Sequence, residues 1–576
     1  MIRIFKHLLL TGSLTAVAFT GLYAQQVDIA QGWKFQKGDH PTFAQPDLNE
    51  NGWQPIAIGK NWESAGFENY DGLGWYRLKV VIPTSLQQSL DKNYNTMLLY
   101  LGQIDDADET YFNGQRIGSS KAYDAQRKYQ VPANLIKWGQ PNLIAVKVTD
   151  TGGGGGMYHG PYQLAPATSR DFISAQTTVA SPDGIFKSGA DIKPGLELNN
   201  QSKEDLQGTL VCRLFTDEHQ PLKTLQQPFT VKQASKQNII FSYVPAKPGF
   251  YRAEFACRLN RSTDSIKAFQ QYGVEPTKLK PALTRPADFT RYWQQARKEL
   301  DVVAPQFKVI PKPELSTGNK NIYLVEMRSL GNALVRGWYS VPKTTGKYPA
   351  ILKVQGYSSE LGPDQGTPDF AVFSLNIRGH GNSKDDVNPG FPGYLLSGIE
   401  NKNQYIYRGA YMDCVRAVDF LTSRPEVDAK RIAVEGGSQG GALSYAAAAL
   451  DKRIALCAPD IPFLSDFRTY FKVGNWPGSE FKQYMQQHPQ KKWEDVYTVL
   501  DYVDIKNLAP MIKVPMIMGV GLLDPVCPPT INFAAYNQVT SEKQYRVYPH
   551  NEHSTAPEHY TLKMNWIRQH FGMKQS

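Results

Sequence analysis

The spacing of hydrophobic residues divides the chain into two parts of different character. In the first part, apolar and polar residues alternate in short runs, as in residues 75–83, 97–104 and 142–150, and Asn113-Gly114 separates two further runs. Alternation with a period of two indicates strands with one buried face, and an Asn-Gly pair between such runs indicates a hairpin. Strands at regular spacing, without helices between them, predict a β-sandwich over residues 25–168.

The strand pattern continues through residues 169–275, with apolar runs at 206–217, 238–245 and 249–260. Short strands joined by polar turns over about 100 residues are typical of an immunoglobulin-like β-sandwich. The segment contains no residues that suggest chemistry, so we expect it to space and orient its neighbours.

The pattern changes after a proline-rich stretch at residues 276–286. Residues 287–301 have helical spacing, with Asp288 as the predicted N-cap, and strand-like and helix-like runs then alternate to the end of the chain. Such alternation predicts a parallel sheet covered by helices. We therefore expect a multidomain chain in which two N-terminal β-sandwich domains precede an α/β domain at residues 276–576.

The N-terminus predicts export. Arg3 and Lys6 precede an apolar run that ends at Ala24, which is the pattern of a cleaved signal peptide over residues 1–24. We therefore expect a secreted or periplasmic protein. The run is too short to cross a membrane comfortably, and no later stretch approaches the roughly 18 apolar residues that a transmembrane helix needs, so no membrane span is expected.

Charge and cysteine content narrow the range of functions. The formal net charge is +10 at pH 7, but there are no basic runs and no nucleic-acid motif, so nucleic acid is not an expected partner. No spacing among the five cysteines resembles a metal site. Cys212 and Cys257 both fall in the second predicted sandwich, and the sequence leaves open whether they form a disulfide. The other three are expected to be free thiols.

The strongest chemical signal lies in residues 431–450, RIAVEGGSQGGALSYAAAAL. A short apolar run is followed by glycines on both sides of Ser438 and Gln439, and then by an alanine-rich run that favours a helix. Strand, glycine turn and helix give the motif G-x-S-x-G the context of a nucleophile elbow. The glycines are needed because side chains there would hold the strand and the helix apart. We therefore predict an α/β-hydrolase domain with Ser438 as its nucleophile.

A serine nucleophile needs a base, an acid that orients the base, and donors for the oxyanion. Residues 514–524 are typical of a strand followed by a loop. This places Asp524 at the carboxyl edge of the sheet, where sheets of this kind build their sites. Asp504 and Asp460 are alternatives, but neither follows so clear a strand. Asp524 is therefore the predicted orienting acid.

The base and the oxyanion donors are expected in loops around the nucleophile. The last predicted strand runs into a loop that contains His550 and His553, and we favour His553 because the longer loop can return over Ser438. The backbone N–H of Gln439 directly follows the nucleophile. The backbone N–H of Tyr357, in the loop after an early strand, is the second predicted donor.

Four features of the first sandwich carry a resemblance to a known module. They are Gly74-Trp75-Tyr76-Arg77, the run from Asp108 through Asn113-Gly114 to Gly118, the run NLIAVKV at 142–148, and the glycine-rich turn before Gly160-Pro161. Residues 25–168 thus resemble the jelly-roll, galactose-binding-like domain of β-galactosidase-like enzymes. The resemblance implies contact with sugars and brings no catalytic signature.

A second resemblance covers residues 276–571. It rests on Arg336-Gly337-Trp338, Gln355-Gly356-Tyr357, Arg378-Gly379-His380-Gly381 and longer runs at 405–421, 425–443, 461–467 and 521–537. Together these resemble the acetyl xylan esterase / cephalosporin-C deacetylase family. The resemblance matches the family's nucleophile, acid and base to Ser438, Asp524 and His553, and its oxyanion donors to Gln439 and Tyr357. Two positions depart from the family: His380 stands where glutamine is usual, and Ser554 where glutamate is usual.

The resemblance implies a secreted serine esterase that deacetylates O-acetylated sugars, in particular acetylated xylan or xylo-oligosaccharides, through an acetyl-enzyme. The expected partner is an acetylated oligo- or polysaccharide, and no cofactor or metal is expected. The family's ring-like oligomers leave a homo-oligomer open. Two other functions remain open from the sequence: a carbohydrate-binding protein whose hydrolase domain is a non-catalytic scaffold, and an exported peptidase of the same fold.

Overall fold

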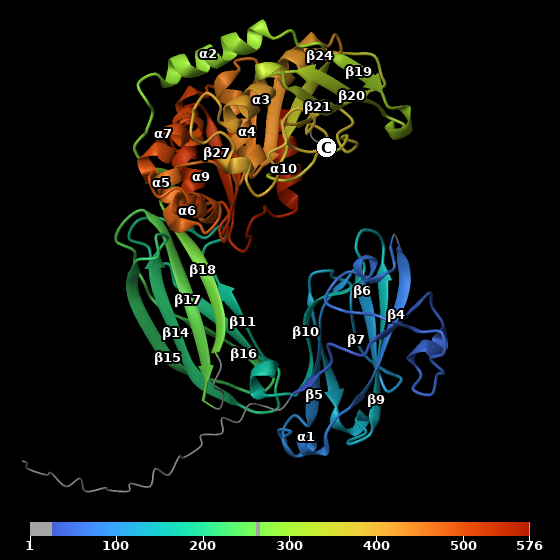
Figure 1. The fold of residues 1–576 in the computed structure, drawn as a ribbon. Coiled ribbons are helices and arrows are strands. Elements are labelled where there is room, and N and C mark those ends of the chain that lie inside the picture. Colours follow the sequence, from blue (N-terminus) through green and yellow to red (C-terminus); the bar gives the residue numbers. More distant parts are fainter. Residues whose placement is uncertain (1–25, 69, 261–264, 575–576) are drawn as a thin grey trace, which may run out of the picture. The chain divides into compact units, whose positions relative to one another are not determined.

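A computed structural model describes residues 26–68, 70–260 and 265–574 of the 576-residue chain. The predicted signal peptide at residues 1–24 lies outside these ranges. Within them, no helix combines the length and the apolar character needed to cross a membrane. The chain forms two compact units (Figure 1). One is the chain up to Ser174 with Asn199–Gln207 and Thr230–Lys236, and the other is Ala175–Leu198, Gly208–Phe229 and Gln237–Ser576.

The first unit contains two antiparallel sheets. Its strands are β1 (Val27–Asp28), β2 (Lys34–Lys37), β3 (Gln54–Pro55), β4 (Gly72–Val81), β5 (Thr96–Asp105), β6 (Ala107–Phe112), β7 (Gln115–Ser120), β8 (Gln126–Pro132), β9 (Pro141–Asp150) and β10 (Gly156–Pro166), with one short helix, α1 (Thr84–Gln88). One sheet has the order β1-β10-β5-β8 and the other has the order β3-β2-β4-β9-β6-β7.

The sequence pattern accounts for these strands. The three alternating runs correspond to β4, β5 and β9, and Asn113 and Gly114 form the turn between β6 and β7 with positive φ values of 48° and 86°. The predicted strands and hairpin are thus confirmed. Trp62 and Trp75 are buried, as expected for large aromatic side chains that fill a core.

Two further sheets follow. Their strands are β11 (Ile173–Thr178), β12 (Ile185–Phe186), β13 (Gly195–Asn200), β14 (Leu206–Thr216), β15 (Pro221–Val231), β16 (Ser235–Ile240), β17 (Gly249–Leu259) and β18 (Ser265–Val274). A three-stranded sheet has the order β11-β13-β16, and a five-stranded sheet has the order β12-β18-β17-β14-β15. Along β17, Ala253, Phe255 and Cys257 are buried, whereas the alternate residues Arg252 and Glu254 are only half-buried. The five-stranded sheet therefore has one core face and one outer face.

All five cysteines are free and buried. Cys212 on β14 lies opposite Phe255 on β17, and Cys257 lies opposite Leu210. The two cysteines are therefore diagonal neighbours, whose Cα atoms are typically about 7–8 Å apart. A disulfide spans a shorter Cα separation, so the register explains why these two thiols are not joined.

The C-terminal region is built on a nine-stranded sheet. Its strands are β19 (Lys308–Pro311), β20 (Lys320–Arg328), β21 (Leu334–Pro342), β22 (Tyr348–Val354), β23 (Ala371–Asn376), β24 (Val427–Gly437), β25 (Leu456–Asp460), β26 (Met516–Gly521) and β27 (Lys543–Tyr548). The order is β19-β20-β21-β23-β22-β24-β25-β26-β27. The pairs from β23 to β27 are parallel, and β19 to β21 form an antiparallel edge.

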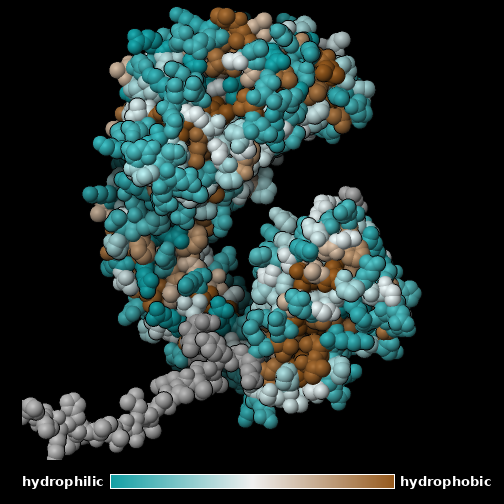
Figure 2. All heavy atoms as spheres, viewed as in Figure 1, coloured by the Kyte–Doolittle hydropathy of each residue, from teal (hydrophilic) through white to brown (hydrophobic). Residues whose placement is uncertain are grey.

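Helices cover both faces of this sheet (Figure 1). The helices of this region are α2 (Phe289–Val302), α3 (Ile406–Ser423), α4 (Gln439–Leu450), α5 (Phe467–Val473), α6 (Gly478–Gln487), α7 (Trp493–Val503), α8 (Ile505–Leu508), α9 (Pro529–Tyr536) and α10 (Glu558–His570). Along β22, Ala350 and Leu352 join the core that contains α3 and α4, whereas Ile351 joins a second core with Trp566 and Ile567 of α10. The alternation predicted from sequence is confirmed as a mostly parallel sheet between helices. Figure 2 shows hydrophilic residues over most of the visible surface of each unit.

The helix predicted at residues 287–301 is α2, but its N-terminus differs from the expectation. Asp288 occupies the N-cap position without a side-chain capping hydrogen bond. Its carboxylate instead accepts hydrogen bonds from Lys402 Nζ at 2.7 Å and from the Tyr502 hydroxyl. Tertiary partners therefore replace the local cap.

The five-stranded sheet packs directly on the C-terminal region. Phe250 of β17 is 2% exposed, and its ring centroid lies 5.7 Å from that of Phe533 in α9. The side chain of Gln270 in β18 donates a hydrogen bond to the Pro549 carbonyl at 2.8 Å. The proline-rich connection is also held, because Asn537 Nδ2 donates to the Pro276 carbonyl at 2.8 Å. This sheet therefore does more than space its neighbours.

Candidate active site

Ser438 sits on a strained turn between β24 and α4. Its φ is 58° and its ψ is −118°, a backbone conformation that non-glycine residues rarely adopt without a functional reason. A Cβ added to Gly440 would lie 2.3 Å from the Val354 carbonyl oxygen, and one added to Gly436 would lie 2.5 Å from the same atom. Glycine is therefore required where the turn approaches β22, as the motif predicts.

Asp524 and His553 are brought together from the carboxyl ends of β26 and β27. His553 Nδ1 lies 2.8 Å from Asp524 Oδ2 and 3.1 Å from Oδ1. The carboxylate is fully buried, and it also accepts backbone N–H bonds from Val526 at 2.8 Å and Cys527 at 2.7 Å. These bonds fix the carboxylate, which in turn orients the imidazole and favours the proton on Nδ1.

The hydroxyl of Ser438 lies near Cys527, which in turn neighbours this pair. Its Oγ is 4.0 Å from Cys527 Sγ, and Cys527, Asp524 and His553 each offer an atom within 4.8 Å of the others. In the described part of the chain, no hydrogen bond joins Ser438 Oγ to His553. Hydrogen bonds between a nucleophile and its base are often long before substrate binds.

The loop that carries the second predicted oxyanion donor, Tyr357, lies beside this turn. Gln439 is the first residue of α4, and Tyr357 follows β22 on a loop where Gly356 faces the Gly437 carbonyl oxygen. Neither the Gln439 N–H nor the Tyr357 N–H donates a hydrogen bond to any residue that the structure describes. Backbone donors without a partner are available to stabilise a developing oxyanion.

The side chain of Gln439 is fixed from two sides. Its Oε1 accepts from the Tyr407 hydroxyl at 2.7 Å, and its Nε2 lies 3.1 Å from His380 Nε2. Burial lowers the pKa of His380 to about 4, so the ring is neutral near pH 7 and can accept from the amide. His380, one of the two positions noted above as departures from the resemblance, therefore accepts a hydrogen bond from the Gln439 side chain.

An aromatic wall that sequence reasoning missed surrounds Tyr357. The ring centroid of Tyr357 lies 4.8 Å from that of Phe391 and 5.1 Å from that of Trp476. Trp476 stacks on Phe463 at 5.2 Å. These residues come from four separate segments. Tyr357 and Phe463 fall in motifs that carry the family resemblance, but no local pattern in the sequence indicates that the four rings meet.

The rival residues have other roles. Asp460 contacts His559 Nε2 and Lys563 Nζ, each at 2.7 Å. Burial raises the pKa of Asp460, but the charge of Lys563 and the hydrogen bonds from both side chains hold that pKa at about 2. Asp504 accepts from the backbone N–H groups of residues 466 and 506, and burial raises its pKa to about 7. His550 is exposed, and its side chain has no hydrogen bond within the described ranges.

Within the described residues, one group of side chains has the spacing of metal ligands: Asp524, Cys527 and His553. A metal would bind the cysteine as a thiolate. Burial raises the pKa of the Cys527 thiol well above its usual value, and the Asp524 charge adds to this. His553 Nδ1 is already engaged with Asp524. The group is therefore better suited to a hydrogen-bonded acid–base pair than to a metal.

Comparisons with known proteins agree with this chemistry. Residues 274–570 match the sequence model for acetyl xylan esterases. The acetyl esterase of Xylanibacter ruminicola is 30% identical over 312 residues, which are 51% of this chain and 70% of that protein. Solved acetyl xylan esterases from Paenibacillus sp. and Thermoanaerobacterium sp. share 34% and 31% identity, each with a TM-score of 0.49 and 98% of its own chain covered; the matches cover 51% and 52% of this chain.

The family match defines the class of the protein, which is a carboxylic ester hydrolase, and the fold and site described above are consistent with that class. The match to the family covers more than half of the 576 residues. The chain therefore belongs to the acetyl xylan esterase family.

Proposed function

We propose that the protein removes acetyl groups from O-acetylated sugars, in particular from acetylated xylan or xylo-oligosaccharides, through an acetyl-enzyme on Ser438. The catalytic residues lie in the α/β-hydrolase domain that we assign to residues 276–576. One observation carries the proposal: His553 is joined at 2.8 Å to the fully buried carboxylate of Asp524, near a serine on a strained turn.

In this mechanism the Ser438 hydroxyl attacks the acetyl carbonyl while His553 Nε2 takes its proton. Asp524 holds the Nδ1 proton and stabilises the imidazolium that forms. The backbone N–H groups of Gln439 and Tyr357 receive the oxyanion, and each such donor typically contributes about 3 kcal/mol of transition-state stabilisation. The imidazolium then protonates the ester oxygen as the bond from this oxygen to the acetyl carbon breaks, so that the sugar leaves with a free hydroxyl. Water, activated by His553, attacks the acetyl-enzyme and releases acetate, so the cycle uses no metal or organic cofactor.

The decisive experiment is the Ser438→Ala substitution, with acetate released from acetylated xylo-oligosaccharides as the readout. The proposal expects turnover to fall about a millionfold, with the thermal unfolding transition unchanged. Near-normal acetate release by this variant would exclude the mechanism. If the wild-type protein bound the oligosaccharide without releasing acetate, a carbohydrate-binding role would replace it, and cleavage of peptides in preference to acetate esters would indicate a peptidase.

The remaining parts of the proposal concern the rest of the chain. We infer export through a signal peptide at residues 1–24, a galactose-binding-like jelly roll at 25–168 and an immunoglobulin-like sandwich at 169–275. The N-terminal sequence of the mature protein tests the first assignment, and glycan binding by the full-length Ser438→Ala variant tests a sugar-binding role of the flanking domains. Light scattering of the purified protein decides whether it is a monomer or a homo-oligomer.

A further inference from the structure

The five-stranded sheet lines a cavity beside the acid and the base. The cavity has a volume of about 380 Å³, and its wall includes Arg252, Phe269 and Gln271 from the sheet, together with Asp524 and Glu552 from the loops after β26 and β27. Glu552 directly precedes His553. The segment that matches the esterase family begins at residue 274, so the three sheet residues lie outside it.

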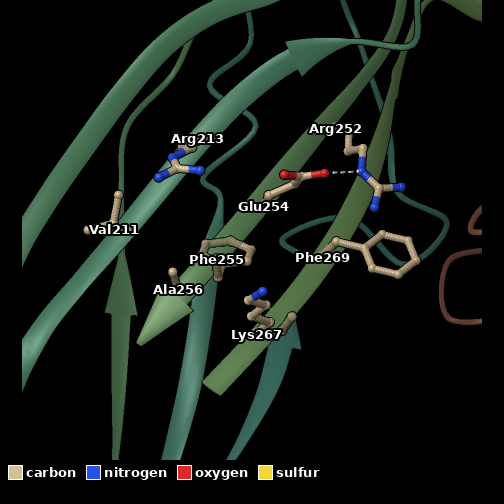
Figure 3. Close-up of a pocket in the computed structure, with 9 residues that line it drawn as sticks. Val211, Arg213, Arg252, Glu254, Phe255, Ala256, Lys267 and Phe269 are labelled. Carbon is tan, nitrogen blue, oxygen red and sulfur yellow. Dashed lines mark hydrogen bonds and ion pairs between the residues drawn. The ribbon is translucent and has the colours of Figure 1, made fainter. Parts of the chain in front are cut away.

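A second hollow of about 290 Å³ continues along the same face of the sheet. It is lined by Arg213, Glu254 and Lys267, and it shares Arg252 and Phe269 with the first cavity. Figure 3 shows these side chains projecting from adjacent strands. We call the two hollows together the sheet groove. Between Lys267 and Gln271 on β18 the groove extends about 13 Å, at roughly 3.3 Å per residue.

The register explains why these side chains share one face. Arg252 lies opposite Gln271, and Glu254 lies opposite Phe269, on the antiparallel pair β17 and β18. Residues two apart on a strand point to the same side, so the core face keeps its apolar residues and the outer face collects charged, amide and aromatic groups.

The walls of the groove are held in place. The Arg252 guanidinium carbon lies 4.0 Å from the centroid of the Phe269 ring, and Arg252 Nε donates to Glu254 Oε1 at 2.8 Å. On β18, Gln270 lies between Phe269 and Gln271 but points to the core face. Its side chain donates a hydrogen bond to the Pro549 carbonyl, in the loop that carries His553. Because these protein side chains are already ordered, they lose little further conformational freedom when a ligand binds.

We propose that the sheet groove binds the sugar chain of the acetylated substrate and so makes the enzyme selective for oligosaccharides over small acetate esters. An aromatic ring offers an apolar surface for a sugar ring, and the guanidinium and amide groups can donate to its hydroxyls. The first cavity reaches the loops that carry Asp524 and His553, and Cys527, three residues after Asp524, lies 4.0 Å from Ser438 Oγ. A sugar chain bound in the groove would therefore extend toward the serine. This inference rests on the proposed esterase function and gives it a substrate class.

The test uses the full-length protein and two substrates, acetylated xylohexaose and p-nitrophenyl acetate. For Phe269→Ala and Gln271→Ala, kcat/KM on the hexasaccharide should fall about tenfold or more, as expected when one contact of about 1.4 kcal/mol is lost. The value on p-nitrophenyl acetate should stay within about twofold of the wild type, because the small ester does not reach the groove. Lys223→Ala is the matched control, since it removes an exposed side chain from edge strand β15 of the same sheet and lines neither hollow.

The possible outcomes separate this inference from the proposed function. Equal losses on both substrates, or no loss on the hexasaccharide, would overturn the inference while leaving the esterase activity in place. If the wild-type protein released acetate from neither of the two substrates, the proposed function itself would be overturned. If Phe269→Ala does not fold, Arg213→Ala, at an exposed position of the groove, provides the same comparison.

Discussion

The two sides of the candidate site are supported in different ways. The serine side is local, because the strained turn, the glycines that allow it and the first N–H of α4 all lie within residues 436–441. The acid–base side is assembled from distant parts of the chain: two loops that follow β26 and β27, with Gln270 of β18 bonded to the start of the second loop. The turn should therefore tolerate few local substitutions, whereas the histidine loop should respond to changes in another sheet.

The largest effect is expected at the base. His553→Ala should lower kcat about a millionfold, as removal of the serine would, because no other group in the described site can take the proton from Ser438. His550→Ala is the matched control, since this exposed histidine on the same loop makes no side-chain hydrogen bond within the described ranges. Single-turnover kinetics with an acetate ester measure both variants. Equal damage from the two changes would remove the distinction between the histidines.

The next largest effect should come from the serine turn. In Gly440→Ala the new Cβ would lie 2.3 Å from the Val354 carbonyl oxygen, so the turn must shift. A displacement of about 1 Å can reduce kcat about a hundredfold, and the crowding should lower the free energy of unfolding by about 1–3 kcal/mol. Urea unfolding and acetate release test this. Gly437→Ala, where an added Cβ meets no atom within 4 Å, should leave the free energy of unfolding unchanged.

A smaller effect tests the long-range support of the acid–base side. Gln270→Ala removes the hydrogen bond to the Pro549 carbonyl, a loss of about 1 kcal/mol or more for a buried bond. The looser histidine loop should lower kcat about tenfold on small and large esters alike. Gln271→Ala, one residue along on the outer face, should affect only the oligosaccharide. Identical substrate profiles for the two variants would contradict the assignment of separate roles.

The smallest effect concerns His380, the buried histidine that contacts the side chain of Gln439. Burial lowers the pKa of His380 to about 4, whereas an unfolded histidine titrates near 6.5. Between these values the unfolded chain binds a proton that the folded protein does not, so the free energy of unfolding should decrease as the pH falls from about 6.5 to about 4, by up to about 3 kcal/mol. His380→Gln should remove this contribution. A difference between wild type and variant that does not vary with pH would contradict the prediction.

Local patterns in the sequence were enough to predict much of this molecule. The alternating runs predicted β4, β5 and β9, and the glycines around Ser438 predicted the turn between β24 and α4, because those features depend on neighbouring residues alone. The positions of Asp524 and His553 after strands also allowed their proximity to be predicted, since parallel strands end at one edge.

Contacts between distant segments could not be predicted in the same way. Gln270 reaches the loop of His553 across 279 residues, and nothing near Gln270 in the sequence indicates its partner. Asp288 illustrates the same limit. The sequence predicts that its side chain caps α2, but its carboxylate accepts hydrogen bonds from Lys402 and Tyr502. Outer-face residues such as Arg252 and Phe269 have an alternating pattern that predicts exposure but not what lies opposite them.

The reactivity of the five buried, free thiols reports local opening of the folded structure. Burial raises the pKa of Cys212 and Cys257 to about 12 and those of the others further, so alkylating reagents have almost no thiolate to attack while the fold is closed. The rate at which iodoacetamide labels each cysteine therefore measures how often the structure around that cysteine opens.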